Sequence, residues 1–104
     1  MGEKFDVSKY IRENRITEGL SKELKCKDGF HMSIQASKGH YCSPRLTNVR
    51  YWSAVEVGFP SEVVEELKKY AEESESYTST VYGWVPIGVV EKIVLDHGGV
   101  ELKA

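Results

Sequence analysis

The chain has 104 residues, 40% of them hydrophobic and 29% charged, a composition typical of one ordinary globular domain that excludes a disordered or fibrous chain. Its formal net charge of −2 argues against a general nucleic-acid binder. No hydrophobic run approaches the roughly 20 residues of a membrane span, and no hydrophobic signal core is present near Met1, so we expect a cytoplasmic protein that does not bind membranes.

The first 27 residues predict helical structure. Residues 5–15 have partial helical spacing of hydrophobic side chains, with Asp6 or Ser8 available as the N-cap. Residues 17–27 are rich in Lys and Glu and predict a second helical segment, interrupted by Gly19. We therefore divide the chain into an N-terminal helical extension over 1–27 and a single domain over 28–104.

Three segments predict β-strands. Residues 30–36 and 50–57 both alternate hydrophobic and polar side chains with period two, and the long loop between them suits an antiparallel hairpin. Residues 78–85 are rich in Thr, Val and aromatic side chains and predict the third strand.

Two helices are predicted around the third strand. Residues 61–71 begin at Ser61 as an N-cap and place their hydrophobic side chains on a single stripe. Residues 86–97 begin at Pro86 and end at a Gly-Gly pair. The predicted fold class is α+β, a small antiparallel sheet of about three strands in the order β-β-α-β-α with both helices on one face.

The loop over residues 37–48 concentrates groups that bind anions. Residues 31–50 contain no Asp or Glu, and residues 1–50 carry a net charge of +4 whereas residues 51–104 carry −6. Arginine holds phosphate through two hydrogen bonds, and aromatic rings stack on bases. An alternative is that the rings fill the core and the cations are solvated. The predicted ligand-binding residues are Lys38, His40, Tyr41, Arg45, Arg50 and Trp52.

The third predicted strand carries two large aromatic side chains. Alternation places Tyr82 and Trp84 on one face, where exposed rings indicate a subunit interface. A three-stranded sheet with helices on one side leaves its other face uncovered, so we expect a homo-oligomer. The alternative is that both rings fill the core.

The two cysteines, Cys26 and Cys42, are too few for a disulfide framework, so we expect reduced thiols. With His31 and His40 they give the spacing C-x4-H-x8-H-x-C, which matches no ordinary zinc finger. We therefore predict no metal, no cofactor and no catalytic residue. The proximity of His40 to Cys42 leaves a small Cys/His-dependent or zinc-binding enzyme as an alternative.

Six segments between residues 28 and 99 form a recognisable pattern: Asp28–Phe30, Met32–Ser37, His40–Arg45, Val55–Ser61, Val81–Pro86 and His97–Gly99. In these segments the chain resembles a family of small phage and prophage proteins of Gram-positive bacteria. The resemblance implies a viral protein that acts in the host cytoplasm, and small phage proteins of this kind are often inhibitors of host defence.

Taken together, the basic loop and the resemblance predict a non-enzymatic anti-defence protein, a sponge that sequesters a phosphate-bearing signal such as a cyclic nucleotide or an ADP-ribose-type ligand. An alternative is an inhibitor that binds a host defence nuclease. In that case the acidic side chains of residues 62–75 would mimic nucleic acid.

Overall fold

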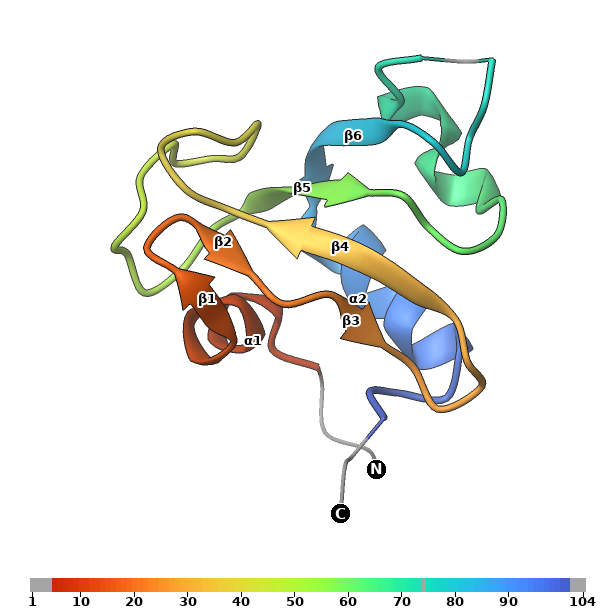
Figure 1. The fold of residues 1–104 in the computed structure, drawn as a ribbon, viewed down its shortest axis with the longest axis horizontal. Helices are drawn as coiled ribbons and strands as arrows, with labels where there is room; N and C mark the ends of the chain where they lie inside the picture. Colours follow the sequence, from red (N-terminus) through yellow and green to blue (C-terminus); the bar gives the residue numbers. More distant parts are fainter. Residues whose placement is uncertain (1–4, 74, 102–104) are drawn as a thin grey trace.

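A four-stranded antiparallel sheet in the order β3-β4-β5-β6 forms the centre of the computed structural model, which describes residues 5–73 and 75–101 (Figure 1). A separate two-stranded sheet pairs β1 with β2. In chain order the elements are α1 (Val7–Glu13), β1 (Arg15–Thr17), β2 (Leu20–Ser21), β3 (Leu24–Lys25), β4 (His31–Gln35), β5 (Ala54–Gly58), the 3-10 helix η1 (Glu65–Tyr70), β6 (Val81–Pro86) and α2 (Ile87–Asp96). The α+β class is confirmed.

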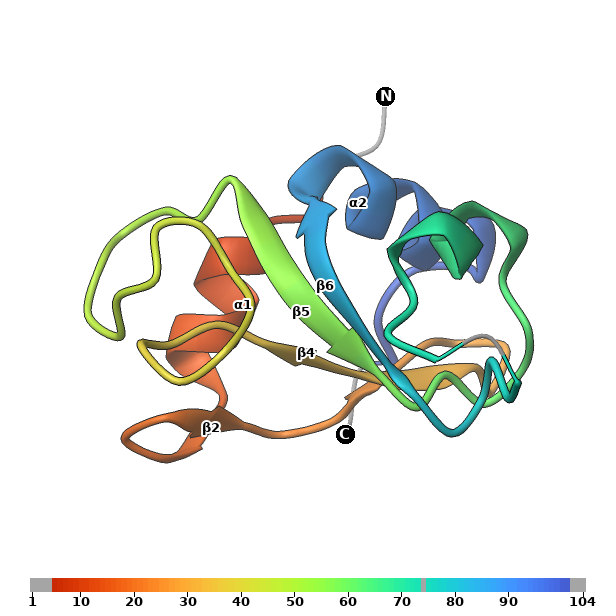
Figure 2. The same cartoon turned by 90° about the horizontal axis from the view of Figure 1, so that it is seen from above.

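The hydrophobic core lies between the sheet and α2, which packs behind the sheet in the view of Figure 1 and above it in Figure 2. The predicted hairpin is confirmed, since β4 and β5 pair antiparallel with Ile34 opposite Val57. The predicted stripe on α2 is also confirmed. The buried side chains that these elements contribute are Met32, Ile34, Val55, Val57, Ile87, Val90, Ile93 and Val94.

The N-terminal segment, which we assigned to an extension over 1–27, contributes Val7, Ile11 and Leu24 to the same buried core as the rest of the described chain. Helix α1 forms as predicted, with Asp6 accepting a hydrogen bond from the Lys9 N–H at 3.0 Å. The predicted helix over 17–27 is replaced by strands, because this segment pairs its backbone with neighbours instead. Leu24 pairs with Met32 of β4 and is fully buried.

The predicted helix over 61–71 is also corrected, since only the short 3-10 helix η1 forms there. The physical reason lies at Ser61, whose backbone N–H and hydroxyl both bond to the backbone of His31, at 2.8 and 3.0 Å. The hydroxyl is therefore not available as an N-cap. Val63 is exposed, which breaks the predicted stripe.

At one end of each outer strand of the four-stranded sheet, another part of the chain forms a bridge to the sheet. Beside β3, Val100 bridges to Cys26, and the Lys27 N–H donates to the Gly99 carbonyl at 2.9 Å. Beside β6, Ala71 bridges to Tyr82. Nowhere in residues 5–73 and 75–101 is a helix both long and apolar enough to cross a membrane.

Candidate functional site

Three arginines meet at one hollow beside the loop that joins β4 to β5. Arg12 and Arg15 come from α1 and β1, and Arg50 comes from the loop. We call this hollow the arginine pocket. Its volume is about 390 Å³ and, among the described residues, no carboxylate lines it. The lining residues are Arg12, Arg15, Thr47, Asn48, Val49 and Arg50.

Arg15 anchors the floor of the arginine pocket. Its Nη2 donates to the carbonyl oxygens of Ala36 at 2.7 Å and Thr47 at 3.1 Å, and its Nη1 donates to the Ser21 hydroxyl at 3.3 Å. Its guanidinium carbon lies 5.6 Å from the ring centroid of Trp52, close enough for a cation–π contact. Burial lowers the pKa of Arg15. The pKa falls from a value so high that the group stays cationic, so the pocket keeps a fixed positive charge.

The other two arginines are more accessible. Arg12 Nη1 donates to the Arg50 carbonyl oxygen at 3.2 Å, which ties α1 to the loop. Both side chains are exposed, and no described acidic group forms a salt bridge with either of them. The guanidinium of Arg50 therefore remains able to bind an anion.

A second feature is a stack of three side chains that joins the loop to β6. The rings of Tyr41 and Trp84 stack with centroids 4.9 Å apart and planes 23° apart. The guanidinium carbon of Arg45 lies 5.5 Å from the Tyr41 ring centroid. We call Tyr41, Trp84 and Arg45 the aromatic stack. It is fixed by the Trp84 N–H, which donates to the Tyr41 carbonyl at 3.0 Å, and by the Tyr41 N–H, which donates to Glu56 at 2.9 Å.

A β-bulge in β6 turns Trp84 away from the core. Val85 pairs with Val55, but Tyr82 pairs with Val57, so two residues of β6 oppose the single residue Glu56. Trp84 has a φ of 50°, a left-handed conformation that costs a non-glycine residue about 1–2 kcal/mol. As a result Tyr82 and Val85 are buried while Trp84 is 48% exposed.

The predicted ligand-binding residues are therefore divided among different places. Arg50 lies in the arginine pocket, Tyr41 and Arg45 lie in the aromatic stack, and Lys38 lines a separate hollow with Leu46. Trp52 is fully buried and donates its indole N–H to the Leu46 carbonyl at 2.9 Å. The predicted contact of Trp52 with a ligand is thus corrected, because Arg15 and the loop cover its ring.

The predicted interface pair is also divided by the bulge. Tyr82 is fully buried, and its hydroxyl donates to the Tyr77 carbonyl. Its predicted place at a subunit interface is therefore wrong, whereas Trp84 is exposed. Strict alternation put the two rings on one face, and the extra residue in β6 reverses the direction of the second ring.

His40 and Cys42 form internal contacts. The Cys42 thiol is buried and donates to the Ser37 carbonyl at 3.2 Å, and burial raises its pKa. His40 Nδ1 lies 2.7 Å from the Ser37 hydroxyl, and burial lowers the pKa of the ring. A protonated, buried thiol is a poor nucleophile. Among the described residues, no group of three or more His, Cys, Asp or Glu side chains is placed to hold a metal.

The acidic surface proposed as a nucleic-acid mimic is interrupted by lysines. Glu65 pairs with Lys68 at 2.9 Å, and Glu66 pairs with Lys92 of α2 at 3.0 Å. These cations neutralise part of the charge that such a mimic needs.

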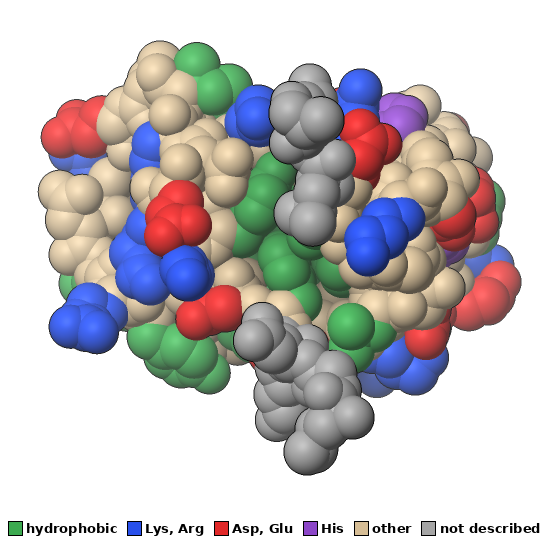
Figure 3. Space-filling view, turned by 90° about the horizontal axis from the view of Figure 1, so that it is seen from below, with side chains coloured by type: hydrophobic (Ala, Val, Ile, Leu, Met, Phe, Trp, Pro, Cys, Tyr) green, Lys and Arg blue, Asp and Glu red, His purple; other side chains and the backbone are tan. Residues whose placement is uncertain are grey.

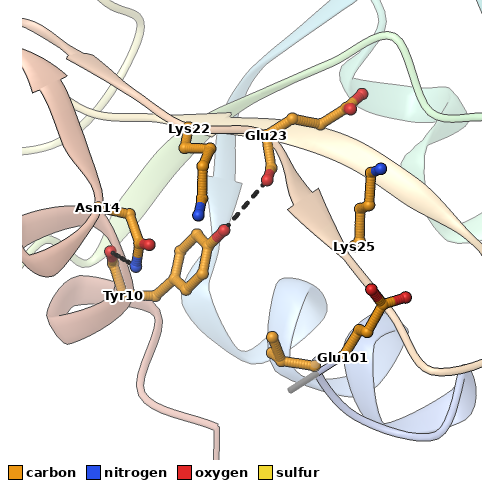
Figure 4. Close-up of a pocket in the computed structure, with 7 residues that line it drawn as sticks. Tyr10, Asn14, Lys22, Glu23, Lys25 and Glu101 are labelled. Carbon is orange, nitrogen blue, oxygen red and sulfur yellow. Dashed lines mark hydrogen bonds between the residues drawn. The ribbon is translucent and has the colours of Figure 1, made fainter. Parts of the chain in front are cut away.

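A further hollow of about 540 Å³ lies between α1 and β3 (Figure 4). Tyr10 crosses it and donates its hydroxyl to the Glu23 carbonyl at 3.2 Å. Figure 3, which views the molecule from below the orientation of Figure 1, shows hydrophobic side chains in a hollow with charges of both signs around it. The lining charges, Lys22 and Lys25 against Glu23 and Glu101, are balanced, so they favour no particular charge of ligand.

Sequence reasoning missed Arg12 and Arg15. Both lie in the segment assigned to an extension, and their meeting with Arg50 depends on how α1 packs against the loop. The signal available in the sequence was the excess of basic over acidic residues in its first half.

Comparison of the chain with family models, with curated proteins and with solved structures found no match.

Proposed function

We propose that the protein binds a small phosphate-bearing molecule and that the arginine pocket is the anion site. The observation that carries this proposal is the meeting of Arg12, Arg15 and Arg50 around a hollow with no described acidic residue in its lining. Three like charges at one place repel each other, and a bound anion removes that repulsion.

The pocket has the chemistry for a phosphate group. Guanidinium groups match the geometry of phosphate oxygens and donate two parallel hydrogen bonds. Arg15 is already held by three hydrogen bonds, so its charge is fixed in place before a ligand arrives. Arg50 and Arg12 supply the accessible donors, and Thr47 and Asn48 add polar groups at the rim.

Sequestration is the use that we propose for this binding. The resemblance to small phage and prophage proteins suggests an anti-defence role in which a phosphate-bearing nucleotide signal is held and not converted. The buried, protonated Cys42 supports a binding protein over a thiol-dependent enzyme.

Isothermal titration calorimetry tests the proposal. We expect saturable heat with at least one of inorganic pyrophosphate, a cyclic dinucleotide and a cyclic ADP-ribose, and weaker binding as the salt concentration rises. Arg50→Ala and Arg12→Ala should each weaken binding about tenfold, which corresponds to about 1.4 kcal/mol.

Lys69→Ala is the matched control, because it removes an exposed cation from η1, away from the arginine pocket. Absence of heat with all three ligands would overturn the proposal. Equal losses in the Arg50→Ala and Lys69→Ala proteins would also overturn it, since they would show a general effect of charge.

A further inference from the structure

We propose that the open part of the Trp84 ring is a stacking site for a single nucleobase. This site is separate from the arginine pocket and does not depend on it, so either can fail alone. The proposal begins from the bulge in β6. Regular alternation after Tyr82 would direct Trp84 into the core, and the chain instead adopts a left-handed conformation that exposes this ring. Backbone strain of this kind gathers at functional sites.

The aromatic stack is prepared for a flat ligand. Tyr41 stacks on one face of the indole ring, and Trp84 is still 48% exposed, so part of the ring remains accessible to a ligand. The backbone N–H of Trp84 donates to the Tyr41 carbonyl, which holds the two backbones, and with them the two stacked side chains, next to each other. A ligand ring that stacks on Trp84 therefore extends an existing stack, and its binding costs little conformational entropy because no new side chain has to be ordered.

The position of Gly83 shows how closely the stack is fitted. A Cβ atom at Gly83 would lie 3.2 Å from the Cβ of Tyr41, so the backbone of β6 and the side chain of Tyr41 are in direct contact. The guanidinium of Arg45 lies over the Tyr41 ring, so this cation contacts Tyr41 and not the open part of Trp84. An exposed indole ring held against a second ring suits the stacking of a flat base.

The surroundings favour a small ligand over a macromolecule. A protein interface of ordinary size buries about 800 Å² on each partner. The other large exposed hydrophobic side chains come from several elements, with Ile16 on β1, Leu95 on α2, and Leu46 and Tyr51 on the loop between β4 and β5. The net charge of −2 disfavours a nucleic-acid strand.

Nuclear magnetic resonance tests the site, because the chain has only two tryptophans and their indole N–H signals report separately. With adenosine at millimolar concentrations we expect a saturable shift of the Trp84 signal and none of the buried Trp52 signal. Arg45→Ala should leave adenosine binding unchanged, because Arg45 contacts the Tyr41 ring and not Trp84.

Trp84→Gly should abolish the binding of adenosine measured by calorimetry, and its fold should persist because glycine adopts a positive φ without strain. Phe59→Gly is the matched control, since Phe59 is also an exposed aromatic residue with a φ of 50°. The proposal is overturned if the Trp84 signal does not respond to adenosine, or if it changes only with protein concentration. It is also overturned if Phe59→Gly weakens adenosine binding as much as Trp84→Gly does.

Discussion

At the scale of single residues, Arg15 has two roles, one electrostatic and one structural. It supplies positive charge to the arginine pocket, and its guanidinium also satisfies backbone carbonyls in two separate segments. Removing its side chain would leave those carbonyls and the Ser21 hydroxyl without their donor. The ring of Trp52 would also lose the cation above it.

We therefore expect Arg15→Ala to lower the free energy of unfolding by about 2–3 kcal/mol, because hydrogen bonds to a charged donor are lost in a partly buried place. Arg12→Ala should lower it by less than about 1 kcal/mol, since Arg12 is exposed and makes one hydrogen bond to the loop. Urea denaturation measures both variants. Equal losses would contradict the structural role of Arg15.

The residues of the candidate site could be predicted from the sequence only in part. Tyr41, Arg45 and Arg50 could be predicted because all three lie in residues 31–50, a stretch with basic side chains and no Asp or Glu. Arg12 and Arg15 could not be predicted in the same way, since they join Arg50 only after α1 and β1 pack against the loop.

At the scale of elements, a regular hydrophobic period predicted β4 and α2 correctly, but it failed for residues 61–71, where only the 3-10 helix η1 forms. Strand β4 alternates and α2 has a stripe, so each shows which side is buried. The segment over 17–27 has no such period, and its strands are two or three residues long, fixed by pairing with neighbours. The bulge in β6 was invisible because an inserted residue changes the period that the prediction depends on.

Replacing two glycines by alanine should change the free energy of unfolding in opposite directions, because Gly83 lies in the β6 bulge against Tyr41 and Gly88 lies in α2 with open space around it. Gly83→Ala should lower the free energy of unfolding by about 1–3 kcal/mol, because its Cβ is forced toward the Tyr41 side chain at 3.2 Å. Gly88→Ala should raise it by about 0.5–1 kcal/mol, since Gly88 lies in α2 and its Cβ meets no atom within 4 Å.

Thermal or urea unfolding of the two variants measures this difference. The Trp84 indole signal should move in Gly83→Ala and stay in place in Gly88→Ala. A stable Gly83→Ala protein with an unchanged Trp84 signal would show that the bulge and Tyr41 are not closely fitted.

At the scale of the whole molecule, the end of α2 is joined to the turn between β3 and β4. His97 follows the helix and stacks on Phe30 with centroids 4.1 Å apart, and its Nδ1 lies 2.6 Å from an Asp28 carboxylate oxygen. Gly98 and Gly99 adopt positive φ and turn the chain back toward β3. These contacts connect segments that lie 69 positions apart in the sequence.

The Asp28 contact predicts a loss of stability in acid. The Phe30 N–H foremost, and then His97, lower the pKa of Asp28 below its ordinary value of 3.8. A carboxyl group with a lowered pKa in the folded state stabilises the fold at every pH above its ordinary pKa. This contribution is lost as the pH falls through the lowered pKa of the folded state. Wild type should be more stable than Asp28→Asn at pH 7, and the difference should shrink below pH 3.8. Urea denaturation across this range measures it, and a difference that does not vary with pH would contradict the assignment.

The bridges at the two outer edges of the central sheet limit how copies of this chain can associate. Val100 beside β3 and Ala71 beside β6 occupy backbone groups that would otherwise template a strand from a neighbouring molecule. At these two positions a strand from another copy can pair with the sheet only after Val100 or Ala71 has moved away. Concentrated solutions of the folded protein should accordingly resist fibre growth until those edge contacts open.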